Sequence, residues 1–254
     1  MNLNGKTAVV TGASRGFGRG IATQLAAEGV KTVALARSRE ALLELEREVT
    51  NIHAAVADTT DGAATSRLMQ DHRPDILVLN AGALPTFHPL HLQTWDTFSQ
   101  NWQVDVKGTF IWLREALLTP LNPGGVIVVI SSGAALHGSP LSGSYASAKA
   151  AQMMLANYAR VTAQELGLNL RVHSLIPNAP TPLTELGERA IRTFAAHQNV
   201  SVEAMTAKFS PPLSPERVAE GVIQLLTNPE YKTVTDATIT AQDFAPLYPA
   251  TVNS

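Results

Sequence analysis

The sequence predicts an α/β fold: a single domain with a doubly wound, parallel seven-stranded sheet and helices on both faces. Three observations lead to this prediction. Short apolar segments rich in β-branched residues alternate with helical patterns, which is typical of consecutive βαβ units. A glycine-rich turn joins the first of these segments to the first helical pattern. Polar residues follow the ends of several strands, and in an open parallel sheet these ends lie along one edge, where ligands bind.

The composition narrows the class of protein. The chain has 254 residues, of which 45% are hydrophobic and 16% are charged, so it can bury a large core. No linker or repeat divides it, and we expect one domain over residues 1–254. A net charge of −2 without a basic stripe argues against nucleic acid as a partner. No apolar stretch reaches about 18 residues, so we expect no membrane partner and a cytoplasmic location. The lack of cysteine excludes disulfides, thiolate metal sites and cysteine nucleophiles.

The first half of the chain is expected to form the first four strands. Each is a short apolar run that ends at a turn or a polar residue. The helical patterns between them repeat apolar residues every three or four positions. The expected strands are 7–11, 32–36, 53–57 and 76–79, and the expected helices are 21–29, 41–49 and 62–71.

The second half contains the longest helical patterns. Residues 95–118 are expected to form one long helix, or two consecutive helices with a break at Gly108. Residues 125–130 form a near-continuous β-branched run, as a strand buried on both faces requires. The periodicity of 183–208 is weak, and we interpret an insertion at about 183–212 as a lid over the site. The other expected elements are a helix from 145 to about 166, a strand over 171–176, a helix from Pro215, a last strand over 233–241 and an extended tail over 243–254.

The glycine-rich turn follows the first strand and has the spacing Gly-x3-Gly-x-Gly. Backbone N–H groups in such a turn can approach a phosphate at the N-terminus of the next helix, where the helix dipole favours anions. A tight connection without a ligand would also use glycine, but the place of the turn between a first strand and a helix favours a phosphate site. The expected cofactor contacts in the turn are Gly12, Ser14, Arg15, Gly16, Phe17 and Gly18.

Two arginines indicate which dinucleotide binds. An acidic residue near the end of the second strand binds a ribose 2′-hydroxyl, whereas an arginine there suits a 2′-phosphate. Arg37 follows the neutral Ala36, and Arg15 is a second cation placed for the same phosphate. The alternative is that both are solvated surface side chains. We expect NADP(H) rather than NAD(H) as the cofactor.

Tyr145 and Lys149 stand four residues apart in a run of small residues, so a helix would present both side chains on one face. An ammonium beside a phenol favours the phenolate, so the hydroxyl can exchange a proton nearer neutral pH. The same spacing is also common on solvated helices. His88 and His91 invite a metal interpretation, but no third ligand stands at a suitable spacing, and we expect a surface loop without a metal.

These motifs together resemble the short-chain dehydrogenase/reductase family over nearly the whole chain, which implies a Rossmann-like fold. The segment from Thr11 to Gly18 is similar to the family's cofactor turn, and Asp58 is similar to its adenine contact. The signature that follows the fourth strand is present as Asn80, Ala81 and Gly82.

The resemblance extends to the catalytic set of the family. Ser132, Tyr145 and Lys149 are similar to that set, with the serine thirteen residues before the tyrosine. This implies hydride transfer between C4 of a nicotinamide and a carbonyl or alcohol carbon. Tyr145 would protonate the carbonyl oxygen during reduction, and Ser132 would hold that oxygen by a hydrogen bond. Lys149 would bind the nicotinamide ribose and lower the pKa of the tyrosine.

Three positions depart from the family pattern. Asp105 stands where the family has an asparagine that helps to hold a proton-relaying water, and we hypothesise that the relay survives with a shifted pH profile. Pro177-Asn178 replaces a usual Pro-Gly, and Thr181, which comes one residue early, is the expected contact to the nicotinamide carboxamide. Residues 240–244 replace a usual Asp-Gly-Gly ending near a subunit interface or the pocket rim.

The expected function is that of an NADP(H)-dependent carbonyl reductase or alcohol dehydrogenase. A catalytically inactive NADP(H)-binding sensor or scaffold on the same fold is the alternative, which the intact catalytic set disfavours. The resemblance and the apolar helices imply a homotetramer, with a dimer as the next choice. A largely apolar ketone is the expected substrate, in a pocket near Leu84, Ala134, Leu136, His137 and Leu141.

Overall fold

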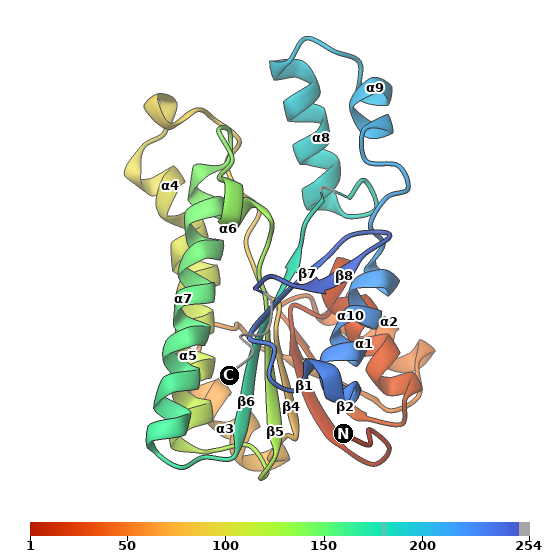
Figure 1. The fold of residues 1–254 in the computed structure, drawn as a ribbon, viewed down its shortest axis with the longest axis vertical. Helices are drawn as coiled ribbons and strands as arrows, with labels where there is room; N and C mark the ends of the chain where they lie inside the picture. The colour runs from red at the N-terminus through yellow and green to blue at the C-terminus, as the bar shows by residue number, and fades with distance from the viewer. Residues whose placement is uncertain (180, 249–254) are drawn as a thin grey trace, which may run out of the picture.

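The sheet at the centre of the molecule has eight strands in the order β3-β2-β1-β4-β5-β6-β7-β8. The computed structural model describes residues 1–179 and 181–248. The strands β1 to β7 are parallel, and β8 runs antiparallel to β7 (Figure 1). The strands are β1 (Thr7–Thr11), β2 (Lys31–Ala36), β3 (Ile52–Val56), β4 (Ile76–Leu79), β5 (Gly125–Ile130), β6 (Leu170–Pro177), β7 (Asp236–Ile239) and β8 (Phe244–Pro246).

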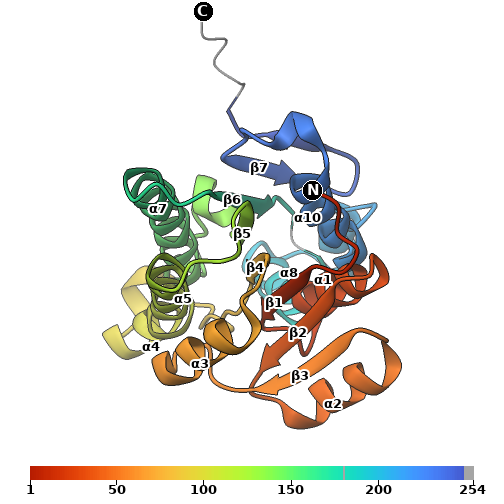
Figure 2. The same ribbon diagram turned by 90° about the horizontal axis from the view of Figure 1, so that it is seen from below.

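Helices cover both faces of this sheet. They are α1 (Gly16–Ala27), α2 (Arg39–Glu48), α3 (Gly62–His72), η1 (Leu90–Leu92), α4 (Trp95–Asn101), η2 (Trp102–Val106), α5 (Lys107–Leu118), α6 (Ala134–His137), α7 (Gly143–Glu165), α8 (Glu185–His197), α9 (Val202–Ala207), α10 (Pro215–Thr227) and η3 (Pro229–Tyr231). The helices α1, α2 and α10 pack on one face, and α3, α5 and α7 pack on the other (Figure 2). Successive residues of β1 serve opposite faces, because Ala8 and Val10 pack with the first group and Val9 packs with the second.

The predicted doubly wound parallel sheet is confirmed, but the predicted strand count is one too low. The strand over Phe244–Pro246 lies in the part of the chain expected to be an extended tail. A turn reverses the chain before it, with the Thr240 amide donating to the Asp243 carbonyl at 2.9 Å, and the rings of Tyr231 and Phe244 pack with centroids 4.7 Å apart. A three-residue strand has too little pattern to be recognised in a sequence. The rest of the tail, 249–254, lies outside the described residues.

The long helical segment over 95–118 is interrupted at Trp102–Val106 and not at Gly108. Those five residues form a π-helical turn between α4 and α5, and Asp105 lies in it. Gly108 lies inside α5 and is a packing position, because a Cβ there would be 2.9 Å from Cγ2 of Thr59. A single turn of π-helix often marks a functional site, since it changes the direction of one side chain.

The predicted lid segment contains α8 and α9. These helices stand beyond the carboxyl ends of the strands, opposite α4 and α6 (Figure 1). Side-chain caps begin both helices: the Thr184 hydroxyl accepts a hydrogen bond from the Gly187 amide, and the Ser201 hydroxyl accepts one from the Ala204 amide. No helix in the described part of the chain combines the length and the apolar character needed to cross a membrane.

Candidate active site

A cavity of 890 Å³ opens at the carboxyl ends of the central strands, between the glycine-rich turn, α7 and α8. Most of the predicted site residues line it, although they come from segments far apart in the sequence. Asp105 and Gly18 do not line it, and neither do Leu136 and Leu141. The predicted residues that do line it are Gly12, Ser14, Arg15, Gly16, Phe17, Arg37, Asp58, Asn80, Ala81, Gly82, Leu84, Ser132, Ala134, His137, Tyr145, Lys149, Pro177 and Thr181.

The pocket prediction was therefore wrong for two apolar residues. Leu141 is buried in the core and does not line the cavity, and Leu136 does not line it either. Sequence analysis missed the aromatic residues of the apolar lining, Phe87 and Phe194, which lie in a loop and in the weakly periodic lid. Among the described residues, no three His, Cys, Asp or Glu side chains are grouped as a metal site.

The glycine-rich turn has the form of a cradle for a phosphate-bearing ligand. Gly12 has a φ of +69°, a conformation that L side chains rarely adopt. A Cβ at Gly18 would overlap the Gly12 carbonyl and the Asn80 amide, so glycine is required there by close packing. The amide of Asn80 donates to the carbonyls of Thr11 and Gly12 at 3.1 and 3.2 Å. Asn80 thus holds the glycine-rich turn in place before α1. The turn remains open towards the cavity.

Both arginines predicted to bind a 2′-phosphate line the cavity, and each is paired with a carboxylate. Arg37 Nη1 lies 3.8 Å from Asp58 Oδ2, and Arg15 Nη1 contacts Glu185 Oε2 at the start of α8. The amide of Thr60, together with its hydroxyl and with Arg37, holds the pKa of Asp58 below its usual value. Both arginine side chains are more than half exposed, so the pairs are screened by water.

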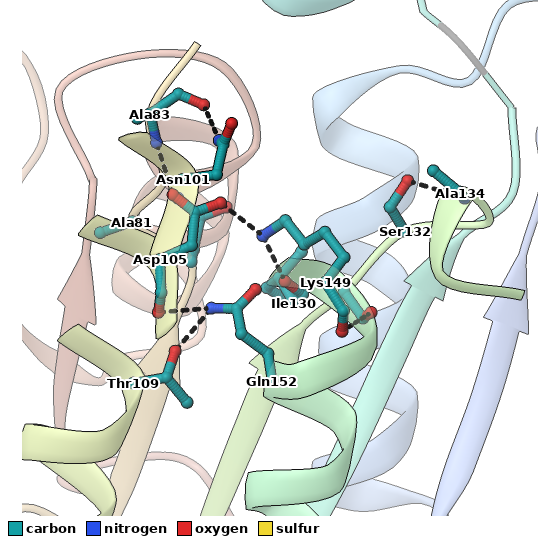
Figure 3. A network of polar contacts seen from close by, with 12 residues as sticks. Ala81, Ala83, Asn101, Asp105, Thr109, Ile130, Ser132, Ala134, Lys149 and Gln152 are labelled. Carbon is teal, nitrogen blue, oxygen red and sulfur yellow. Dashed lines mark hydrogen bonds and ion pairs between the residues drawn. The ribbon is translucent and has the colours of Figure 1, made fainter. Parts of the chain in front are cut away.

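Ser132, Tyr145 and Lys149 form the opposite wall of the cavity. Ser132 follows β5, and α7 carries Tyr145 and Lys149 one turn apart, as predicted. Two hydrogen bonds fix α7 against the end of β5: Ser131 Oγ donates to the Lys149 carbonyl at 3.1 Å, and Lys149 Nζ donates to the Ile130 carbonyl at 3.0 Å (Figure 3). The ammonium lies 5.6 Å from the centre of the Tyr145 ring.

Asp105 lies behind Lys149, on the side away from the cavity. Its Oδ1 accepts a hydrogen bond from the Ala83 amide at 2.7 Å, and its Oδ2 lies 3.9 Å from Lys149 Nζ (Figure 3). Oδ2 is buried and has no hydrogen-bond partner in the described part of the chain. The backbone carbonyl of Asp105 accepts from Gln152 Nε2 at 3.1 Å, and the same amide also donates to Thr109 Oγ1. The π-helical turn therefore directs both the side chain and the carbonyl of Asp105 towards α7.

Burial dominates the proton affinities on this wall. It raises the pKa of Asp105 and lowers that of Lys149, while the attraction between the two groups opposes both shifts. Burial also raises the pKa of Tyr145 to about 12; a hydrogen bond with Ser132 opposes the rise, and the Asp105 charge adds to it. The predicted lowering of the Tyr145 pKa by Lys149 depends on the bound cofactor as well; in the protein alone, Lys149 is itself desolvated and its ammonium donates to the Ile130 carbonyl.

Asn178, which stands where the family usually has a glycine, packs against Gly133 in the structure. A Cβ at Gly133 would overlap Oδ1 of Asn178, so the amide occupies the space of a side chain at position 133. Gly133 has ordinary helical backbone angles, φ −55° and ψ −25°, which any residue can adopt. Glycine therefore stands at position 133 because there is no room for a Cβ, and not because of the backbone conformation. Gly133 and Asn178 both line the cavity beside Ser132. Gly133 and Asn178 lie in two different loops, and nothing in the sequence indicates that a small residue at one position must match a larger residue at the other.

Comparison with known proteins identifies the family. Residues 6–192 match the family described as short chain dehydrogenase, which is well over half of the chain. The chain belongs to the short-chain dehydrogenase family. It is 32% identical, over 88% of its length and 90% of the other chain, to an uncharacterized NAD-dependent oxidoreductase of Mycobacterium tuberculosis. It is 30% identical to carbonyl reductase [NADPH] 2 of Sus scrofa, over 74% of this chain and 76% of that one.

The fold of this short-chain dehydrogenase is also found among solved structures. The 3-ketoacyl-(acyl-carrier-protein) reductase from Brucella melitensis, complexed with NADH, superposes with a TM-score of 0.79 over 94% of this chain and 98% of that chain, at 23% identity. Membership of the family implies an oxidoreductase that uses a nicotinamide cofactor. The glycine cradle, the long cavity and the polar groups of its two walls fit such a dinucleotide.

Proposed function

We propose that this short-chain dehydrogenase is an NADP(H)-dependent carbonyl reductase that interconverts a ketone and a secondary alcohol. The observation that carries the proposal is the meeting of Ser132, Tyr145 and Lys149 on one wall of the cavity, across from the glycine-rich turn. A binding module would need none of these three groups together, whereas carbonyl reduction uses a proton donor, a group that holds the carbonyl oxygen and a cation beside them.

The side chains on this wall are suited to reduction. The bound cofactor supplies a hydride to the carbonyl carbon. With a pKa raised to about 12, Tyr145 stays protonated at neutral pH and can give its proton to the oxygen as negative charge develops there. Ser132 Oγ accepts a hydrogen bond from the Ala134 amide at 3.2 Å, which orients the hydroxyl that would hold the same oxygen.

Lys149 and Asp105 would replace the proton taken from Tyr145. The side chains of Lys149 and Asp105 are 5% and 0% exposed, so neither group exchanges protons freely with solvent. Burial raises the pKa of Asp105 and lowers that of Lys149, so both shifts favour the neutral form of each group and bring their proton affinities closer together. We therefore keep the hypothesis that the relay survives with a shifted pH profile, in which the Asp105 carboxyl itself takes part.

The lining favours a largely apolar ketone. Leu84, Phe87 and Phe194 contribute apolar surface from two sides of the cavity, and Ala134 and His137 lie at the end of β5 beyond Ser132. The imidazole of His137 and the exposed amide of Asn178 are among the polar groups that line the cavity with Ser132. A ketone with an apolar body and one further oxygen function fits this lining best.

Preference for NADP(H) rests on Arg15 and Arg37, and on the neutral Ala36 that ends β2 directly before Arg37. Related chains carry both kinds of name, NAD-dependent and NADPH. The test is direct: dissociation constants of NADPH and NADH, followed by fluorescence of the bound reduced nicotinamide, and then NADPH oxidation with a panel of aryl, cyclic and hydroxy ketones. Equal affinity for the two cofactors would refute the NADP(H) preference. Binding without turnover of any ketone would favour the alternative, an inactive sensor or scaffold.

We also propose a homo-oligomer, a tetramer first and a dimer next. Large apolar side chains are exposed along the outer faces of α5 and α7 and would be covered by a second copy. A light-scattering mass equal to one chain would refute this. The residues that form this exposed apolar surface are Phe110, Leu118, Met154, Tyr158, Val161 and Leu166.

A further inference from the structure

The contact between the glycine-rich turn and α8 is made by charged side chains. Arg15 is the N-cap residue of α1, and Glu185 is the first residue of α8. Arg15 Nη1 contacts Glu185 Oε2, while Arg189 Nη2 binds the other carboxylate oxygen, Oε1, at 2.9 Å. Glu185 therefore bridges two arginines and uses a different oxygen for each.

The backbones of the two helix ends are close enough to make this contact persistent. A Cβ at Gly16 would lie 3.5 Å from Cγ2 of Thr184, the residue that caps α8. All four residues of this contact, Arg15, Gly16, Thr184 and Glu185, line the cavity. The carboxylate of Glu185 thus lies at the N-terminus of α1, where the helix dipole and Arg15 attract an anion.

We infer that Glu185 is a specificity-determining residue that competes with the 2′-phosphate of NADP(H) for Arg15. The inference rests on the proposed use of NADP(H). The guanidinium of Arg15 cannot bind the carboxylate and a phosphate with the same donors, so binding the phosphate requires the contact with Glu185 to be given up or shared. NADH carries no 2′-phosphate and leaves the pair intact. Glu185 accordingly lowers the selectivity for NADPH that Arg15 and Arg37 create.

The other charges near Glu185 decide how strong this competition is. Arg189 holds one carboxylate oxygen and weakens the hold of Glu185 on Arg15. Arg37 is paired with Asp58 and not with Glu185, so it remains a separate cation for the phosphate. Because Arg15 is 65% exposed and Glu185 is 35% exposed, the competition changes affinity by a few-fold rather than by orders of magnitude.

The test measures dissociation constants of NADPH and NADH for the full-length protein by fluorescence of the bound reduced nicotinamide, at low salt. In Glu185→Gln, the affinity for NADPH relative to NADH should rise about two- to fivefold, since any effect on the pyrophosphate is common to both cofactors. Arg189→Gln should shift selectivity the opposite way, because Glu185 then pairs with Arg15 alone. The effect of Glu185→Gln should disappear in an Arg15→Gln background and shrink in about 0.5 M salt.

Glu188→Gln is the matched control. Glu188 lies in the same first turn of α8 and pairs with Arg192 at 2.9 Å, but it does not line the cavity. Its substitution costs the helix the same charge and should leave both dissociation constants unchanged. An equal change in the two constants in Glu185→Gln would assign Glu185 to lid closure and overturn the inference, as would an effect that persists without Arg15.

The inference and the proposed function fail in different ways. If Arg15→Gln and Arg37→Gln weaken NADPH binding while Glu185→Gln changes nothing, the NADP(H) preference stands and the role of Glu185 is refuted. If wild-type protein binds NADH as tightly as NADPH and neither arginine matters, both are refuted. Adenosine 2′,5′-bisphosphate serves as a probe without nicotinamide, and Glu185→Gln should tighten its binding by the same factor.

Discussion

The two walls of the cavity carry the same kinds of charged group in opposite surroundings. On the outer wall, formed by β1, β2 and α1, Arg15 and Arg37 pair with carboxylates in contact with water. On the inner wall, formed by β4, β5 and α7, Lys149 and Asp105 approach to 3.9 Å with side chains 5% and 0% exposed. A charge pair is screened on the outer wall and desolvated on the inner wall.

Because of this difference, the outer wall is suited to binding the cofactor and the inner wall is suited to proton transfer. Exposed pairs can exchange partners at little cost, so the outer wall can choose between two similar cofactors by small differences in affinity. Buried groups change their proton affinities by large amounts, so the inner wall can hold and move a proton. The following predictions test this contrast, beginning with the largest expected effect.

Tyr145→Phe should lower turnover of any ketone substrate by about 10²- to 10⁴-fold, because the proton donor of the inner wall is lost. Cofactor dissociation constants should change little. Tyr158→Phe is the control, since Tyr158 lies on the same helix but is 59% exposed. Steady-state rates with NADPH give the readout, and a Tyr145→Phe enzyme with near wild-type turnover would remove tyrosine from the mechanism.

Gly133→Ala should destabilise the inner wall by about 1 kcal/mol, because the exposed Asn178 amide must turn away from the added methyl group, which still lies 3.1 Å from the Asn178 Cα. Thermal unfolding and kcat should both reveal the overlap. The double variant Gly133→Ala/Asn178→Gly should recover most of the loss, since glycine at 178 vacates the space. Lack of recovery would show that Gly133 is required by its backbone rather than by Asn178.

Asp105→Asn should change the pH dependence of turnover, because a buried carboxyl with a raised pKa is replaced by an amide that does not titrate. The folded-state pKa of Asp105 is raised, so the folded protein binds more protons than the unfolded chain. The contribution of Asp105 to stability is therefore full below its unfolded pKa and falls as the pH rises through the folded value. In Asp105→Asn, the part of the pH dependence of turnover that comes from the Asp105 carboxyl should vanish. The loss of stability with rising pH that this carboxyl causes should vanish as well.

Asp96→Asn, an exposed substitution in the first turn of α4, is the control for these two pH profiles. It should leave the rate profile and the unfolding profile of the wild type in place. If Asp105→Asn gives the same profiles as well, Asp105 does not tune the proton relay.

Arg37→Gln, on the outer wall, should have the smallest effect. NADPH binding should weaken by about two- to fivefold at low salt and by less at 0.5 M salt, because an exposed charge is screened there. NADH binding should not change. A loss in NADPH affinity that is independent of salt would mean that Arg37 acts from a desolvated position, which would contradict the contrast between the walls.

The sequence by itself determined the fold class and brought the candidate catalytic residues to one edge of the sheet. Short, β-branched apolar runs such as 125–130 favour strands buried on both faces, and the carboxyl ends of parallel strands share one edge of the sheet. This was enough to place Ser132, Tyr145 and the glycine-rich turn around one site. These predictions depend on spacing along a strand or a helix turn, which is local and therefore readable from a sequence.

Only the tertiary structure decided which groups meet across the chain. The π-helical turn that directs Asp105 to Lys149, the overlap of Asn178 with the space beside Gly133 and the pairing of Arg15 with Glu185 join residues that lie far apart in the sequence. The raised pKa of Tyr145 follows from burial rather than from the Tyr-x3-Lys spacing. Desolvation and steric fit depend on everything packed around a group, and local spacing carries no information about either.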